Sequence, residues 1–213
     1  MCWPGLCKAL LKCLQAELAP DSKKVDANYH KALRVFTTVA CHASRAGCLA
    51  RTARSLFWHI TNTLTAFGAG HPVADDAAQA LDKLLADAAC APLCVAPDLA
   101  RLISFLTGAA AAAAAARPPR GAAPHLRRLE HVLAACPASL PAPVVEETLR
   151  AFVGDEAALF ARLAEEQNDL KLSRSLVAAF FAFLQHHGAE ALAQLPPVLP
   201  CSHALLQPGS LCM

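Results

Sequence analysis

Apolar residues recur every three or four positions along most of this chain, which is the spacing of one face of an α-helix. The first such stripe consists of Leu6, Leu10, Leu14 and Leu18. Proline, glycine and short polar residues separate successive stripes, as they do at helix ends. The pattern predicts helices at residues 5–19, 23–45, 48–67, 74–90, 97–108, 124–136, 143–153, 155–166 and 169–187.

The strongest apolar stripe lies in the last predicted helix, residues 169–187. Its members are Leu172, Leu176, Val177, Phe180, Phe181 and Leu184. We expect Phe180 and Phe181 to straddle the buried face of this helix. Gly188 should end it, which would place His186 and His187 at its C-terminus, where an imidazolium interacts favourably with the helix dipole.

Helices of this length joined by short turns predict an all-α fold built from stacked helix pairs. None of the tight consensus repeats occurs in the sequence. The fold class predicted is therefore an α-solenoid of degenerate HEAT-like pairs, whose repeats share little beyond apolar spacing. A globular helical bundle is the competing architecture.

Two stretches depart from the helical pattern. Residues 109–116 are all alanine, and Pro118 and Pro119 soon follow, where a helix must end. We interpret residues 109–123 as a low-complexity Ala/Pro/Arg loop between helix pairs. Residues 196–213 hold four prolines without periodicity and are interpreted as a disordered tail. The predicted organisation is residues 1–108 as the first helical-repeat segment, 109–123 as the loop, 124–195 as the second segment and 196–213 as the tail.

Composition narrows the classes of protein. Hydrophobic residues make up 55% of the chain and charged residues 17%, which excludes disorder for most of its length. No run reaches the 18 or more uninterrupted apolar residues typical of a membrane span, so we expect no membrane partner. Lys8 and Lys12 interrupt the first apolar stretch, which does not resemble a secretory signal. Nucleus or cytoplasm is the expected location.

The net charge of +2 hides an uneven distribution. Residues 1–54 carry a balance of +6, whereas the rest of the chain carries −4. A basic segment is typical of a surface that faces an acidic partner or nucleic acid, and solvated helix faces are the alternative. The predicted partner-binding residues are Lys24, Lys31, Arg34, Arg51 and Arg54. Reversing the arginines among them to Glu should then leave stability nearly unchanged.

Ten cysteines and nine histidines invite a metal hypothesis. Cys90 and Cys94 are the one tight pair in a plausible loop, but no spacing joins them to His71, His131 or Cys136. Other cysteines fall on apolar stripes, where a thiol acts as a small hydrophobe. These are Cys7, Cys13, Cys41, Cys48 and Cys136. We therefore expect structural thiols, with no metal and no cofactor.

Motifs for catalysis are equally hard to find. The sequence contains no Gly-x-Ser-x-Gly, no phosphate-binding glycine loop and no His-Glu-x-x-His. The segment Leu81-Asp82-Lys83-Leu84-Leu85 matches the LxxLL docking pattern, but leucines at this spacing are what a core-facing helix produces. We expect no enzymatic activity and no small-molecule substrate, and no catalytic residue is assigned.

The order of the elements resembles a known family. Trp3 opens a helix that runs through Cys7-Lys8-Ala9-Leu10-Leu11-Lys12-Cys13-Leu14. A basic helix follows, from Lys23-Lys24 through Tyr29 to Arg34-Val35-Phe36, with Ala40-Cys41 and Arg45 near its end. The next helix runs from Cys48 through Leu56-Phe57 to Ile60 and Leu64. Much later, Asn168-Asp169-Leu170 enters the apolar helix with Leu176-Val177 and Phe180-Phe181.

This succession resembles the N-terminal helical region of the ataxia-telangiectasia-mutated (ATM) family of Ser/Thr protein kinases. The resemblance covers roughly residues 3–190 and rests on diffuse apolar and basic spacing rather than on an invariant motif. The family's short basic motif and its kinase domain have no counterpart in this sequence, so no catalytic residue is carried over.

The resemblance implies a non-catalytic nuclear scaffold, a fragment of a recruitment arm that binds partner proteins of the DNA damage response and telomere maintenance. DNA is a further candidate partner, through the basic N-terminal third. The alternative function is a stand-alone cytosolic helical-repeat adaptor for protein–protein interaction.

Overall fold

The structure is a computed structural model that describes residues 5, 6, 9, 12, 31, 33–35, 37–39, 41, 50–116, 119–136, 139–154, 158–164 and 170–194. Within these ranges the regular structure is helical and no strand occurs. The all-α expectation is therefore confirmed. The predicted tail at 196–213 and most of the first two predicted helices lie outside the described residues.

The helix bounds follow the apolar pattern except at the C-terminal ends of α5 and α9, which extend further than predicted. The α-helices are α3 (Ala50–Phe67), α4 (Pro72–Ala86), α5 (Ala96–Ala115), α6 (Ala122–Ala135), α7 (Ala142–Val153), α8 (Leu159–Ala164) and α9 (Leu170–Gln194). Two short 3-10 turns, η1 (Ala91–Leu93) and η2 (Pro119–Gly121), precede α5 and α6. The described residues from 31 to 41 are also helical.

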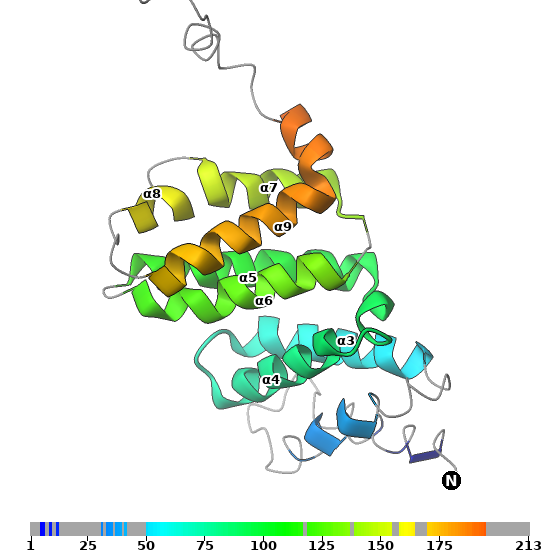
Figure 1. The fold of residues 1–213 in the computed structure, drawn as a ribbon. Coiled ribbons are helices and arrows are strands. Elements are labelled where there is room, and N and C mark those ends of the chain that lie inside the picture. Colours follow the sequence, from blue (N-terminus) through cyan, green and yellow to red (C-terminus); the bar gives the residue numbers. More distant parts are fainter. Residues whose placement is uncertain are drawn as a thin grey trace, which may run out of the picture.

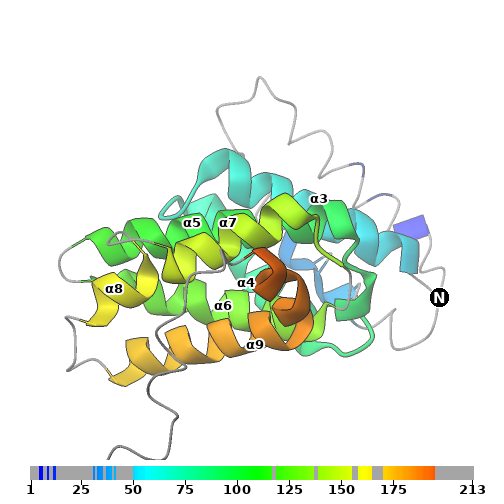
Figure 2. The ribbon, with the colours of Figure 1, turned by 90° about the horizontal axis from the view of Figure 1, so that it is seen from above.

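The larger helices form two layers (Figures 1 and 2). Helices α3, α5 and α7 form one layer, in which α5 contacts both neighbours. Helices α4, α6 and α9 form the other, in which α6 contacts both neighbours. Contacts between α3 and α4, between α5 and α6 and between α7 and α9 join the layers, so successive helix pairs stack on one another.

Local signals explain the sharp turn between α3 and α4. Gly68 and Gly70 have φ angles of +74° and +88°, a region where side chains with a Cβ are strained. His71 then caps α4, because its Nδ1 accepts a hydrogen bond from the backbone N–H of Val73 at 3.3 Å. Pro72 occupies the first turn, where its missing N–H costs nothing.

The alanine run departs from the predicted loop. Residues 109–115 continue α5, and Ala110 and Ala114 are buried. Alanine loses no side-chain entropy in a helix, and its small methyl lets neighbouring elements approach closely. The loop assigned to residues 109–123 is therefore wrong over the alanines. Pro119–Gly121 form a 3-10 turn that leads into α6.

Helix α5 is also the one described helix that is long and apolar enough to cross a membrane. In the fold it is a central core element that contacts α3, α6, α7 and α8. Its buried residues Leu99, Leu102, Ile103 and Leu106 pack inside the protein. The apolar character of α5 accords with its central position between helix pairs.

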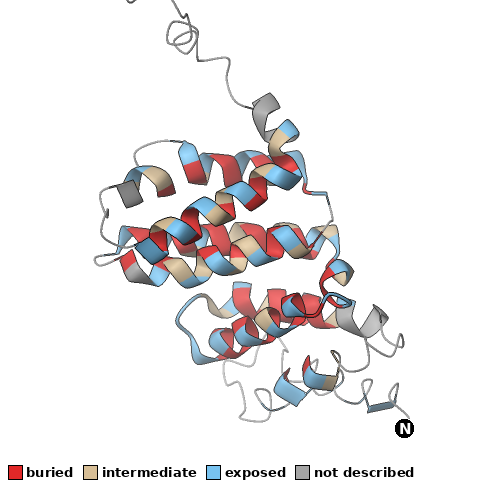
Figure 3. Ribbon diagram, viewed as in Figure 1, coloured by how far each residue is buried: buried red, intermediate tan, exposed pale blue. Residues whose placement is uncertain are grey.

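The core lies where helices of the two layers face one another (Figure 3). Its largest fully buried side chains include Phe57 of α3, Leu81 of α4, Phe152 of α7 and Phe183 of α9. Leu81, Leu84 and Leu85 are all buried, which confirms that the LxxLL segment is a core-facing helix.

Helix α9 is rotated relative to the predicted register. Phe183 is fully buried, whereas Phe181 is 62% exposed and Val177 is 55% exposed. Phe180 is half-buried, with its ring centroid 5.2 Å from that of Phe152. The expectation that Phe180 and Phe181 straddle the buried face is therefore wrong. Because α9 is apolar on two opposite sides, periodicity alone offers two registers.

The end of α9 also differs from the prediction. The helix continues past Gly188 to Gln194, so His186 and His187 lie inside it rather than at its C-terminus. His187 is buried, and its ring lies 5.9 Å from that of Phe183. It packs in the core instead of covering terminal carbonyls.

The register of α9 makes a stability prediction. Phe183→Ala should lower the free energy of unfolding by about 3–5 kcal/mol, because it removes a fully buried aromatic ring. Phe181→Ala should change it by less than about 1 kcal/mol, because that ring is mostly in solvent. Urea unfolding followed by circular dichroism measures both values. Equal losses in the two variants, or the reverse order, would contradict this register.

Candidate partner-binding site

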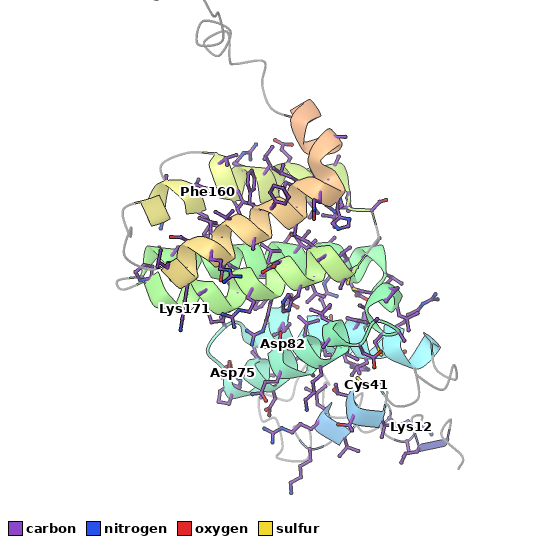
Figure 4. The ribbon with its side chains drawn as sticks, in the orientation of Figure 1. Lys12, Cys41, Asp75, Asp82, Phe160 and Lys171 are labelled. Atoms are coloured by element: carbon purple, nitrogen blue, oxygen red, sulfur yellow. The ribbon has the colours of Figure 1, made fainter. Side chains whose placement is uncertain are left out.

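The predicted basic surface is only partly described. Lys31, Arg34 and Arg54 have exposed side chains. Lys24 and the side chain of Arg51 lie outside the described part of the chain. In Figure 4, Lys12 and Cys41 lie at the N-terminal end of the protein below α4, whereas Lys171 lies on the opposite side of α4, on α9.

Arg34 is engaged within the protein. Its Nη2 donates to Oδ1 of Asp76 on α4 at 2.7 Å, and the Asp76 carboxylate is almost fully buried. A buried carboxylate needs such a charged partner, since leaving it unpaired costs several kcal/mol. Arg34 thus holds the helical residues near position 34 against α4, while Lys31 and Arg54 stay exposed.

A first groove separates α4 from α6 and has a volume of about 520 Å³. Its lining includes Leu85 and Ala134, with Arg127 and His131 exposed at its edge. Across it, Arg128 Nε donates to both carboxylate oxygens of Asp82, at 3.0 and 3.2 Å. This ion pair ties α6 to α4.

A second groove of about 690 Å³ lies between α6 and α9. Its apolar lining comes from Leu170, Val177, Ala178 and Phe181 of α9 and from Ala134 of α6. Its charged lining residues are Glu130 and Arg174. Ala134 lines both grooves, so they form one continuous surface on the layer of α4, α6 and α9.

The apolar residues of the second groove form an ordered stripe. Leu170, Val177 and Phe181 are separated by seven and four positions, which places them on one face of α9. All three are large and exposed. Single exposed hydrophobes are normal on a protein surface, whereas these three share one face of α9 and line the same groove.

Three titratable groups on α3, α5 and α6 have pKa values shifted by burial. Burial lowers the pKa of His59 on α3 from 6.5 to about 4. Burial also lowers the pKa of His125 on α6, with a smaller contribution from the positive charge of Arg128. Burial raises the pKa of Asp98 at the start of α5, against the opposing effect of Arg101. Both shifts favour the neutral imidazole in the folded protein.

The structure groups the described thiols differently from the sequence spacing, which singled out Cys90 and Cys94. Cys94 and Cys136 share a hydrogen bond, and this bond together with burial raises the pKa of Cys94. Cys136 Sγ also donates to the backbone carbonyl of Ala91 at 3.4 Å. His71 caps α4 and His131 lines the α4–α6 groove, so neither lies with these thiols as part of one cluster.

Another group was missed in the sequence. The potential ligand atoms of Cys41, Asp87 and Cys90 all lie within 4.8 Å of one another. Asp87 and Cys90 are separated by two residues, a spacing that zinc sites use, but one of the two is a carboxylate rather than a second cysteine. Cys41 comes from a distant helix, and no local pattern indicates that it joins them.

Comparison with known proteins adds no relative. No protein-family model matches the chain, and no curated protein or solved structure is significantly similar to it. The interpretation of its surface therefore rests on its own residues.

The ion pair of Arg34 corrects the expectation that all the predicted arginines can be reversed without cost. Arg34→Glu should lower the free energy of unfolding by about 1–3 kcal/mol, because it leaves the buried Asp76 carboxylate facing a like charge. Arg54→Glu is the matched control and should cost under about 0.5 kcal/mol. Denaturant unfolding of the two variants tests this, and equal effects would mean that the Arg34–Asp76 contact contributes nothing.

His59 makes a prediction for pH dependence. Its folded pKa of about 4 lies below the unfolded value of 6.5, so the unfolded chain binds the proton more readily. Above pH 6.5 His59 is neutral in both states and does not oppose folding. As the pH falls from 6.5 toward 4, protonation of His59 in the unfolded chain lowers the free energy of unfolding by up to about 3 kcal/mol.

The measurement is the free energy of unfolding at pH about 7 and about 4.5. His59→Gln should show a smaller loss between these two values than the unmodified chain. His131→Gln removes an exposed histidine and should leave the loss unchanged. The same loss in all three proteins would contradict the assignment to His59.

Proposed function

We propose that this chain is a non-catalytic helical scaffold that binds an amphipathic helix of a partner protein in the groove between α6 and α9. The observation that carries the proposal is the exposed apolar stripe of Leu170, Val177 and Phe181. The opposite side of α9 is packed in the core. Helix α9 is therefore apolar on two faces, as is typical of a helix that is covered on both sides.

The dimensions of the stripe favour a helical occupant. Leu170 and Phe181 are eleven positions apart, which corresponds to about 17 Å along the helix axis. About three turns of a partner helix span this distance, with anchors at i, i+4 and i+7. The small side chains of Ala134 and Ala178 in the lining leave room for those anchors.

The charges around the surface favour acidic residues on the occupant. Arg127 and Arg174 are exposed on α6 and α9, and Glu130 on α6 is half-buried. Arg128, in contrast, is neutralised by Asp82. A partner helix with acidic residues beside its apolar face therefore complements the groove.

The architecture supports the same surface. The finer fold that we propose is the α-solenoid of HEAT-like pairs, with α3/α4, α5/α6 and α7/α9 as successive units. Solenoids bind their partners along one continuous layer of helices. Both grooves lie on the layer of α4, α6 and α9.

The cellular role stays a prediction. The resemblance to the ATM family implies a nuclear recruitment scaffold with partners in the DNA damage response, and with DNA as a further candidate partner through the basic N-terminal third, where Lys31 and Arg54 are exposed. The alternative is a cytosolic adaptor. Helix binding by the α6–α9 groove serves either role.

The test uses a displayed library of helical peptides, selected for binding to the full chain. Val177→Asp should weaken the selected peptides by more than about tenfold, because it places a charge in the apolar lining. Val153→Asp is the matched control, since Val153 is an exposed valine of α7 outside both grooves. Fluorescence anisotropy measures the affinities, and circular dichroism shows that both variants remain folded.

Several outcomes would overturn the proposal. Selected peptides that bind equally well to Val177→Asp, or that bind in an extended conformation, would place recognition elsewhere. A dimer in analytical ultracentrifugation that Val177→Asp abolishes and Val153→Asp retains would assign the groove to a second copy of this chain instead.

A further inference from the structure

We propose that Cys41, Asp87 and Cys90 bind one zinc ion. Two thiolates and a carboxylate are a donor set that zinc accepts, and the three ligand atoms already lie within 4.8 Å of one another. This replaces the interpretation of Cys41 and Cys90 as purely structural thiols. It is independent of the proposed groove.

The turn that carries two of the ligands is closed by hydrogen bonds. The backbone N–H of Cys90 donates to the carbonyl of Asp87 at 2.9 Å, which closes the turn between them. The Asp87 side chain accepts from the backbone N–H of Ala89 at 3.0 Å, which orients the carboxylate. Two ligands separated by two residues on one closed turn resemble half of a structural zinc site.

The third ligand approaches from another helix. Cys41 Sγ lies 4.0 Å from the backbone carbonyl of Lys83 in the last turn of α4. In Figure 4 its side chain lies directly below α4. Zinc–sulfur and zinc–oxygen bonds of about 2.3 and 2.1 Å place tetrahedral ligands about 3.5–4 Å apart, so a movement of about 1 Å closes the site.

Its surroundings favour a cation. Asp87 is the C-cap of α4, and the carbonyl end of a helix carries a partial negative charge. Cys90 and Asp87 are buried, whereas Cys41 is half-buried. The ion can therefore enter beside Cys41, and water completes its coordination as the fourth ligand.

Binding has a defined proton balance and a structural consequence. Both thiols must release a proton to the solvent to bind zinc as thiolates, so affinity should rise with pH. The bound ion links the helix of Cys41 to the C-terminal end of α4, while Arg34 and Asp76 join the same two elements nearer the start of α4. Because the ligands are brought together only in the folded chain, zinc should raise the melting temperature.

Cobalt(II) provides the probe, because it occupies zinc sites and its thiolate charge-transfer absorption reports the number of bound sulfurs. Reduced full-length protein, titrated without oxygen, should bind one equivalent of cobalt, and zinc should displace it. Cys41→Ser and Cys90→Ser should each remove about half of the charge-transfer intensity, because one of two thiolates is lost. Asp87→Asn keeps the acceptor for Ala89 and should retain that band.

Affinity gives the second readout. Loss of even an outer partner of a metal ligand costs about 10–100-fold, so all three substitutions should weaken cobalt binding by at least about tenfold. Zinc should raise the melting temperature of the unmodified chain and not that of Cys41→Ser. Cys94→Ala and Cys136→Ala are the controls and should preserve the band, the affinity and the zinc-induced shift.

The result that would overturn the proposal is equally specific. Absence of a charge-transfer band in the folded, unmodified protein would show that no site forms. A band that keeps its full intensity in both Cys41→Ser and Cys90→Ser, or one that Cys94→Ala removes, would place the thiolates elsewhere. Circular dichroism of each variant establishes that a lost signal is not a loss of folding.

Discussion

The packing of α9 on α6 and α7 is the contact on which the rest of the surface depends. Phe183 is fully buried, and its ring lies 6.1 Å from that of Phe152 on α7. Ala179 is fully buried one turn earlier, where its small side chain permits close approach. This choice of face directs Val177 and Phe181 outward, so the stability of the helix pair and the existence of the groove have one cause.

Two long-range interactions extend the same logic to the N-terminal part of the protein. The Arg34–Asp76 ion pair joins the helical residues between 31 and 41 to α4, and the zinc proposed at Cys41, Asp87 and Cys90 would join the same elements. A paired buried charge has a large penalty if it is broken, and metal binding adds directly to folding free energy. Polar chemistry therefore reinforces an interface to which Leu33 and Thr37 also contribute buried side chains.

Local physics made much of the fold predictable from the sequence. Apolar periodicity placed most helices within a few residues, and Gly68, Gly70 and Pro72 marked the turn between α3 and α4 correctly. The errors arose where local patterns permit two answers. Alanines 109–115 suit a loop of low complexity or a helix, and only packing against neighbouring helices selects the helix. The two apolar sides of α9 likewise leave its rotation undetermined until α6 and α7 are in place.

The candidate site was harder to predict, because it depends on which residues meet. Net charge drew attention to Arg34, but its partner Asp76 belongs to another helix. The leucine, valine and phenylalanine on the outer side of α9 are as apolar as the residues on its buried side, so the sequence alone does not show which face is exposed. The thiol cluster was equally hard to predict, because only the tertiary fold brings Cys41 close to Asp87 and Cys90.

A crystal structure of the chain with a selected helical peptide would test the central claim most directly. We expect a peptide helix lying along α9 from Leu170 to Phe181, with its apolar side on α9 and α6 and its acidic residues near Arg127 or Arg174. A peptide bound on the layer of α3, α5 and α7, or bound in an extended form, would contradict it.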